Sequence, residues 1–388
     1  QSEYLRQVNH LQSSLNLEHG PLLRLAYISS GPEMPDKLLI IIHHLTIDGV
    51  SWRILLEDFQ NAYQQLRDGQ EIHLPEKTSS FKEWAEKLQK YARSDKIRSE
   101  LNYWLSTTAG EDGDLPCDFN KGENTRDSQR FFKTKLTKED TQKLLKQLPG
   151  ALQTNMDEVL LGALSTTLSE WTGNNTIYID LESHGREEIG RAIDVSRTVG
   201  WFTSIFPLRL EINDPANIQD SLLAVKKQFR SIPDKGIGYG LLRYLSSSKE
   251  VENQFNRRRT PQLSLNYLGQ IDSVFEQNTD FRISEKNRGI EIYPGALRTH
   301  LIEIECMVLK GQLIIEWVYS INYHRQATIE KLAYRFIEYL QQLIQLADSM
   351  QEKQYLPSDF PLAGLDQKKL EKLASLIDKD DHQGKDML

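Results

Sequence analysis

The stretch IIHHLTIDGVSW, residues 41–52, places two adjacent histidines between an apolar run and the start of a helix. The apolar run is continuous rather than alternating, which predicts a buried strand over residues 37–43. After Gly49, large apolar side chains recur at helical spacing and predict a helix that ends near Gly69. These side chains are Trp52, Leu55, Leu56, Phe59, Tyr63 and Leu66. A strand that passes through polar residues into a helix is typical of an α/β fold.

Strands and helices continue to alternate along the rest of the chain. A helical segment covers about residues 80–107, and an amphipathic helix spans about residues 327–347. Further strands are expected at residues 22–28, 203–211, 262–267 and 312–319. This order of elements predicts α/β layers.

A change in composition near the first third of the chain predicts two lobes. Residues 108–129 are rich in glycine, aspartate and asparagine and have no periodicity, which is typical of a crossover. We therefore assign residues 1–128 to an N-terminal lobe with its linker and residues 129–366 to a C-terminal lobe. The charged residues 367–388 are expected to form a linker or docking tail. Because the chain opens at Gln1 in polar helical sequence, we expect it to be a fragment of a longer polypeptide.

The composition restricts the class of protein. The 388 residues are 39% hydrophobic and 26% charged, as in globular proteins, and a net charge of -8 leaves no electrostatic footprint for nucleic acid. The sequence contains neither a run of 18 apolar residues nor a signal peptide, so a membrane or secretory role is unsupported. Cys117 and Cys306 lie far apart without CxxC spacing, which argues against a disulfide framework or a zinc site and fits the cytoplasm.

The two histidines allow a structural and a catalytic interpretation. On a strand, successive side chains face opposite sides, so His43 and His44 cannot both point into one cleft. Metal ligands must converge on one point, so the opposite directions of the two side chains argue against a metal site, and we predict none. One imidazole is therefore expected in the core and the other in a possible site, where its ordinary pKa suits general acid–base work. Asp48 is expected to fix the loop that orients it.

A second polar cluster, DLESHGRE at residues 180–187, follows another predicted strand. Its titratable side chains include Glu182, His184, Arg186 and Glu187. They form either a solvated strand end with a local ion pair or the place of a second acid–base group. Spacing alone leaves both interpretations open.

Three further segments combine glycine with aromatic or polar residues. RTVGWFTSIFPLRL at residues 197–210 places a Trp-Phe pair ahead of an apolar strand. PDKGIGYGLLRYL at residues 233–245 lacks GxGxxG spacing and the Lys-Ser/Thr ending of a phosphate loop, so a tight turn is favoured over phosphate binding. LSLNYLGQ at residues 263–270 contains Asn266 and Tyr267, which either pack in the core or line a polar cleft.

Taken in order, these stretches resemble motifs of the epimerization domains of nonribosomal peptide synthetases, which belong to the condensation superfamily. HHLTIDGVSWRILLEDF resembles the HHxxxDG motif with the extension GVSWRILLEDL, and LESHGRE is similar to EGHGRE, with Ser183 where glycine is common. RTVGWFT, PDKGIGYG and NYLG match three further motifs, and YLPSDFPLAGLDQ resembles the usual exit from such a domain. The resemblance covers nearly the whole chain. The Pro-rich, Gln-containing motif that usually opens these domains is absent, so we expect the N-terminal lobe to be incomplete.

The resemblance implies two lobes, each like a chloramphenicol acetyltransferase subunit, in a V-shaped pseudodimer with the active site in a tunnel between them. It implies that His44 and Glu182 are the catalytic acid–base groups and face each other from opposite lobes. Five supporting residues are assigned other roles. His43 is expected to pack in the core and Asp48 to orient the loop. The remaining three line the tunnel or stabilise the oxyanion: Arg186, Asn266 and Tyr267.

The implied reaction inverts the Cα, from L to D, of an aminoacyl or peptidyl residue held as a thioester on the 4′-phosphopantetheine of a peptidyl carrier protein. No cofactor of the domain's own is expected, because the thioester itself acidifies the α-proton. The implied partners are an upstream carrier protein domain and a downstream condensation domain or synthetase, within a larger monomeric chain. The alternatives are a condensation domain that joins two carrier-bound substrates by an amide bond and a catalytically silent docking module.

Overall fold

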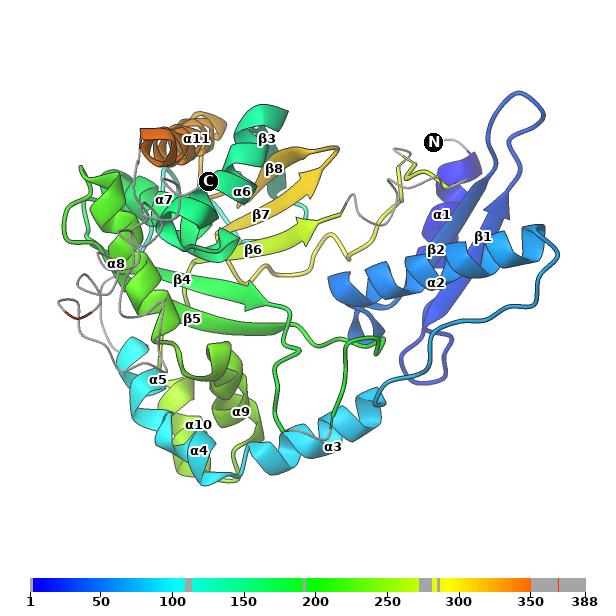
Figure 1. Ribbon diagram of the computed structural model, residues 1–388, viewed down its shortest axis with the longest axis horizontal. Helices are drawn as coiled ribbons and strands as arrows, with labels where there is room; N and C mark the ends of the chain where they lie inside the picture. The colour runs from blue at the N-terminus through cyan, green and yellow to red at the C-terminus, as the bar shows by residue number, and fades with distance from the viewer. Residues whose placement is uncertain are drawn as a thin grey trace, which may run out of the picture.

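The first part of the chain folds around a small antiparallel sheet (Figure 1). Strand β1 (Leu23–Ile28) pairs with β2 (Lys37–Ile42). Helices α1 (Glu3–Ser13) and α2 (Gly49–Arg67) flank this pair, and we call these four elements the small lobe. The computed structural model describes residues 3–108, 114–190, 193–271, 281–284, 287–349 and 369.

The strands of the small lobe are only half-buried. Every second residue of β1 is exposed: the exposed fractions of Leu23, Leu25 and Tyr27 are 46%, 58% and 71%. The prediction that both strands are buried is therefore wrong for the described residues. A continuous apolar run is ambiguous in this respect, because it does not reveal how many faces of a strand are covered.

The paired histidines lie beyond the end of their strand. Strand β2 ends at Ile42, and a 3-10 helix, η1 (His44–Thr46), follows. Asp48 then starts α2 by accepting a hydrogen bond from the Ser51 backbone N–H on its Oδ1 at 2.7 Å, an N-cap that satisfies a free amide of the first turn. The prediction that strand alternation separates the two histidines is therefore wrong, because the chain has already left the strand.

Six later strands form the second sheet: β3 (Gln129–Lys135), β4 (Thr176–Ser183), β5 (Ser204–Glu211), β6 (Leu263–Gln270), β7 (Ile302–Leu309) and β8 (Gln312–Ser320). Their order is β3-β8-β7-β6-β4-β5. Strand β6 runs parallel to both β4 and β7, whereas the other neighbours are antiparallel, so the sheet is mixed. The parallel pairing of β4 with β6 sets Glu182 directly opposite Asn266.

Helices cover the apolar face of this sheet (Figure 1). They are α6 (Lys138–Leu152), α7 (Met156–Thr172), α8 (Ile218–Arg230) and α11 (Gln326–Ser349). Along β7, Ile302, Ile304, Cys306 and Val308 are buried and alternate with half-buried residues, as in a strand with one face packed on the core. Helix α7 packs between α8 and α11, and its residues 158–169 are all buried.

The predicted helix over residues 80–107 is divided into three. Ser94 interrupts it, because its side chain accepts a hydrogen bond from the Ile97 backbone N–H and starts a new helix. Trp84, Ile97 and Trp104 are buried in the core of the six-stranded sheet. The helices at this end are α3 (Phe81–Tyr91), α4 (Asp95–Ser99), α5 (Leu101–Thr107), α9 (Ile237–Leu245) and α10 (Lys249–Asn256). We call the six-stranded sheet with α3 to α11 the large lobe. Helices α3 to α5, at residues 81–107, pack on this lobe. The domain boundary at residue 128 stays a prediction.

Several predictions fall on residues outside the described ones. These are part of the crossover (109–113), the end of the C-terminal lobe from residue 350, and the tail 367–388 apart from Lys369. The predicted late amphipathic helix corresponds to α11. Among the helices of the described residues, none combines the length and the apolar character that crossing a membrane requires.

Candidate active site between the lobes

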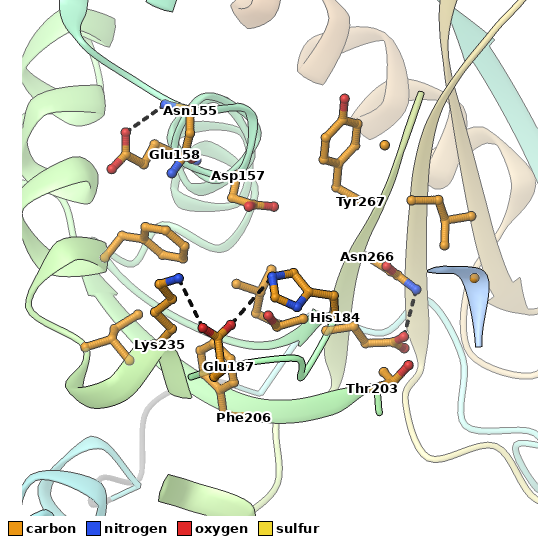
Figure 2. A pocket seen from close by; sticks show the side chains of 18 of the residues that line it. Asn155, Asp157, Glu158, His184, Glu187, Thr203, Phe206, Lys235, Asn266 and Tyr267 are labelled. Atoms are coloured by element: carbon orange, nitrogen blue, oxygen red, sulfur yellow. Dashed lines mark hydrogen bonds and ion pairs between the residues drawn. The ribbon is translucent and has the colours of Figure 1, made fainter. Parts of the chain in front are cut away.

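A pocket of about 910 Å³ opens between the start of α2 and the ends of β4 and β6 (Figure 2). Asp48 and Arg53 line it from the small lobe, and the start of α7 and the segment that follows α8 complete the wall from the large lobe. The charged residues of the large lobe that line it include Asp157, Glu158, Glu182, Glu187, Arg230 and Lys235.

Glu182 lies near the end of β4 and lines this pocket. Asn266, opposite it on β6, donates a hydrogen bond from Nδ2 to Glu182 Oε2 at 2.7 Å. Burial, followed by the negative charge of Glu305, raises the pKa of Glu182 to about 7, although His300 acts in the opposite direction. A carboxyl with this pKa exists in both protonation states near neutrality, which suits a group that gives and takes a proton.

Tyr267 and Asp157 add two more titratable groups to the pocket. Burial, and then the charge of Asp157, raises the pKa of Tyr267 to about 12, so its hydroxyl stays protonated and can donate a hydrogen bond. Asp157 stands in the first turn of α7, and burial together with Glu158 raises its pKa to about 6. Sequence reasoning missed Asp157, since acids in a first helical turn are common and nothing in the local pattern distinguishes this one.

In the LESHGRE segment, Glu187 has His184 on one side and Lys235 on the other along the pocket wall (Figure 2). His184 Nε2 lies 3.6 Å from Glu187 Oε1, and Lys235 Nζ of the 3-10 helix η2 (Pro233–Gly236) lies 3.1 Å from Glu187 Oε2. The contact between His184 and Glu187 corresponds to the local pair that one interpretation of this segment expects, and it is ionic when the imidazole is protonated. Because Glu182 of the same segment lines the pocket, the two interpretations do not exclude each other.

Asp48 and Arg186 connect the two lobes. Arg186 Nη2 lies 3.2 Å from Asp48 Oδ1 and donates a hydrogen bond to Ser51 Oγ at 2.9 Å. The backbone N–H of Phe202 donates to Asp48 Oδ2 at 3.0 Å. Only 3% of the Asp48 side chain and 7% of the Arg186 side chain are exposed, so the pair is desolvated. Asp48 thus has the contacts of a structural residue.

The surroundings of Arg186 correct the prediction that it lines the pocket. It is absent from the pocket wall, and its Nη1 donates hydrogen bonds to the carbonyls of Val195 and Thr198. Its guanidinium lies 4.0 Å from the centre of the Phe202 ring. Gly185 precedes it at φ +65°, and a Cβ there would approach the Phe202 carbonyl oxygen to 1.7 Å, so glycine is required for this turn.

The two histidines have different surroundings. His44 is exposed, and its ring centre lies 5.4 Å from that of Trp201 in an edge-on contact between the lobes. His43 is half-buried, and its Nδ1 accepts a hydrogen bond from the Leu45 backbone N–H at 3.2 Å, which caps η1. His44 is not among the residues that line the pocket with Glu182.

Of the predicted site residues, the structure therefore places Glu182, Asn266, Tyr267 and Asp48 around one pocket. The two histidines and Arg186 lie outside it. Within the described part of the chain, no group of three or more His, Cys, Asp or Glu side chains is arranged to hold a metal ion. The arrangement offers a half-buried carboxyl, a hydrogen-bond donor that holds it, and a neutral phenol.

The mixed sheet and the interlobe pocket define a two-lobed α/β protein with titratable side chains in the pocket between its lobes. The family model of the condensation domain matches residues 2–365, and the chain belongs to this family. It is 43% identical over 366 residues to a linear gramicidin synthase protein of Brevibacillus parabrevis, and 38% identical over 371 residues to tyrocidine synthase 2 of the same organism. These matches cover 94% and 95% of this chain but only 5% and 10% of the two relatives.

Solved structures also match the fold. The epimerization domain from the third module of tyrocidine synthetase B aligns with a TM-score of 0.82 and 38% identity, over 89% of this chain and 77% of that one. The X-domain from teicoplanin biosynthesis aligns with a TM-score of 0.61 and 18% identity, over 86% of this chain and 74% of that one. The second similarity concerns the fold alone.

Proposed function

We propose that this chain is an epimerization domain of a nonribosomal peptide synthetase. It inverts the Cα, from L to D, of an aminoacyl or peptidyl thioester carried on the phosphopantetheine of a peptidyl carrier protein. The observation that carries this proposal is Glu182, a half-buried carboxyl with a pKa of about 7, held by Asn266 in the interlobe pocket. The 38% identity to an epimerization domain supports the same conclusion.

Glu182 fits the chemistry of an α-proton transfer. A base removes the α-proton, the C–H electron pair forms a C=C bond, and the carbonyl electrons move onto oxygen to give an enolate. A proton delivered to the opposite face of Cα reverses these changes and leaves the inverted centre. A carboxyl that titrates near neutrality can serve on one face in either direction, and Tyr267 can donate a hydrogen bond to the enolate oxygen.

His44 is the proposed second acid–base group. It belongs to the small lobe, whereas Glu182 belongs to the large lobe, so the two would act on opposite faces of a substrate held between them. Because the imidazole contacts Trp201 outside the pocket, the proposal requires it to turn toward the bound thioester. The overall architecture proposed with this mechanism is a V-shaped pair of lobes like chloramphenicol acetyltransferase subunits.

The proposed partners follow from the substrate. A carrier protein domain would present the thioester on its phosphopantetheine arm, and a condensation domain or another synthetase would receive the D-configured product. The domain itself would need no cofactor. The names of the relatives, linear gramicidin synthase and tyrocidine synthase, support a place in nonribosomal peptide biosynthesis.

Amide-bond formation is the second candidate function, because the matching family model is that of the condensation domain. It joins two carrier-bound substrates and has no requirement for a proton-transfer carboxyl such as Glu182. A catalytically silent docking module would show neither reaction.

Chiral analysis of the aminoacyl group released from a loaded carrier protein tests the three functions together. We expect the protein to convert L-aminoacyl thioester into a mixture of L and D forms, and Glu182→Gln to abolish this conversion. Glu188→Gln is the matched control, because Glu188 is exposed and lies outside the pocket. Amide formation, or an unchanged L-thioester with the unsubstituted protein, would contradict the proposal.

A further inference from the structure

Asp157 differs from its neighbours on the pocket wall in the contacts that its carboxylate makes. It lies in the first turn of α7, between residues that are already engaged. Asn155 caps the helix by accepting from the Glu158 backbone N–H at 2.9 Å, and Glu158 Oε2 accepts from the Asn155 backbone N–H at 2.9 Å. Arg230 Nε donates to Glu158 Oε1 at 2.5 Å. The neighbours of Asp157 therefore complete the helix start without it.

The carboxylate of Asp157 has no such partner. Among the described residues, none forms a hydrogen bond or an ion pair with this side chain, although it is half-buried. Of the Lys and Arg side chains that line the pocket, Lys235 pairs with Glu187, Arg230 pairs with Glu158 and Arg53 donates to the Leu268 carbonyl. Neither these three nor Lys227, which also lines the pocket, forms an ion pair with Asp157. A partly desolvated carboxylate without a counter-charge is unfavourable, and a cationic ligand would relieve this cost.

The ionisation of Asp157 allows it to act as an anion. Burial and the charge of Glu158 raise its pKa to about 6, so the carboxylate still prevails at pH 7.5. The side chain also faces the substrate space. Figure 2 shows Asp157 pointing into the region that Tyr267 and Asn266 border from the other side.

We propose that Asp157 binds a primary ammonium group of the substrate and thereby makes the pocket selective for a substrate with a free amine. The inference rests on the proposed function, because it assumes that the pocket holds the acyl group of a carrier-bound thioester. Asp157 is then a specificity residue, whereas Glu182 transfers the proton.

Two sources of the ammonium group fit this chemistry. The α-ammonium of an aminoacyl thioester is bonded to the carbon that is inverted, and Tyr267, whose pKa responds to Asp157, directly follows the Asn266 that holds Glu182. The other source is a cationic side chain on a residue whose own α-amine is acylated. Selection of the first source favours aminoacyl over peptidyl substrates, and selection of the second favours a basic residue.

Binding of three unreactive pantetheine amides distinguishes these sources. The probes are L-phenylalanyl-, N-acetyl-L-phenylalanyl- and Nα-acetyl-L-ornithyl-aminopantetheine, which carry an α-ammonium, no ammonium and a side-chain ammonium. We expect Asp157→Asn to weaken binding of one ammonium probe roughly tenfold or more, the strength of a charge-assisted contact, and to leave the neutral probe unchanged. Isothermal titration calorimetry at pH 7.5 measures all three dissociation constants.

Asp140→Asn is the matched control, because Asp140 occupies the first turn of α6 in the same lobe, away from the pocket. It should bind all three probes as the unsubstituted protein does. Equal affinities of the unsubstituted protein and Asp157→Asn for each probe, or an equal loss for all three, would overturn the inference. Because binding is measured without turnover, ammonium-selective binding with no L-to-D conversion would overturn only the proposed function. Conversion without ammonium selectivity would overturn only the role of Asp157.

Discussion

Asp48 of the small lobe and Arg186 of the large lobe form a buried ion pair, with 3.2 Å between Asp48 Oδ1 and Arg186 Nη2. Asp48 also caps α2, and Arg186 follows β4 by three residues, so the pair fixes the start of one element against the end of the other. The pocket opens at this junction. The contact between the lobes is thus a condition for the geometry of the site.

Removing the cation of this pair should destabilise the protein. Arg186→Met leaves the Asp48 carboxylate buried without its counter-charge, and we expect the free energy of unfolding to fall by about 3 kcal/mol. Urea unfolding at pH 7.5 measures it. Arg209→Met, which removes an exposed partner of Glu211, should cost less than about 1 kcal/mol. Equal losses for the two variants would mean that the interlobe pair is no more important than a surface contact.

The raised pKa of Glu182 predicts a pH-dependent effect on stability. Folding raises the pKa of Glu182 from the ordinary value of 4.5 to about 7. A protein with such a group is stabilised by it below the unfolded-state pKa and loses this stability as the pH rises to the folded-state pKa, here between about pH 4.5 and pH 7. Glu182→Gln has no charge to bury. The difference between its free energy of unfolding and that of the unsubstituted protein should therefore shift in favour of the variant by up to about 3 kcal/mol between pH 4.5 and pH 8. Parallel urea titrations at the two pH values would reveal the difference, and a constant offset would show that Glu182 titrates normally.

Asn266 should affect the reaction through Glu182. Its Nδ2 donates to the carboxylate form, so Asn266→Ala should raise the pKa of Glu182 further. We expect the limb of the pH–rate profile that reports this group to move to higher pH in Asn266→Ala. Asn253→Ala, at an exposed position of α10, is the control. An unshifted profile in Asn266→Ala would remove this hydrogen bond from the mechanism.

The adjacent histidines should differ in their contribution. His44→Ala is expected to reduce L-to-D conversion by about a hundredfold or more, the usual effect of losing an acid–base group. His43→Ala removes the cap of η1, so its main effect should be a loss of stability of about 1 kcal/mol. Chiral product analysis and thermal unfolding of both variants separate activity from stability. Full conversion by His44→Ala would exclude it as the second base.

Part of the pocket could be identified from the sequence, because polar residues after an apolar strand mark a strand end. This pattern marks Glu182, Asn266 and Tyr267 as candidates, and the family resemblance assigns them to a site. The parallel pairing of β4 with β6 explains why Glu182 and Asn266 meet. That pairing joins residues 84 positions apart, and no local pattern reveals it. Local patterns also failed for the histidines, because alternation holds only within a strand and β2 ends at Ile42.

Arg186 and Asp157 show the other limit of local patterns. The partner of Arg186 lies 138 positions away in the other lobe, so its burial in an ion pair depends on how the lobes meet. Asp157 resembles any acid in the first turn of a helix until the helix is placed beside a pocket. Both roles arise from tertiary contacts rather than from the residues next to them.

Exchange of the α-proton in D2O tests the central claim most directly. A carrier protein loaded with an L-aminoacyl group is incubated with the protein, and deuterium at Cα is measured in the released L and D forms. If Glu182 transfers the proton on one face of Cα, deuterium should appear at Cα of the D product, and Glu182→Gln should form no D product. A D product without deuterium, or undiminished formation of D product by Glu182→Gln, would contradict the proposed mechanism.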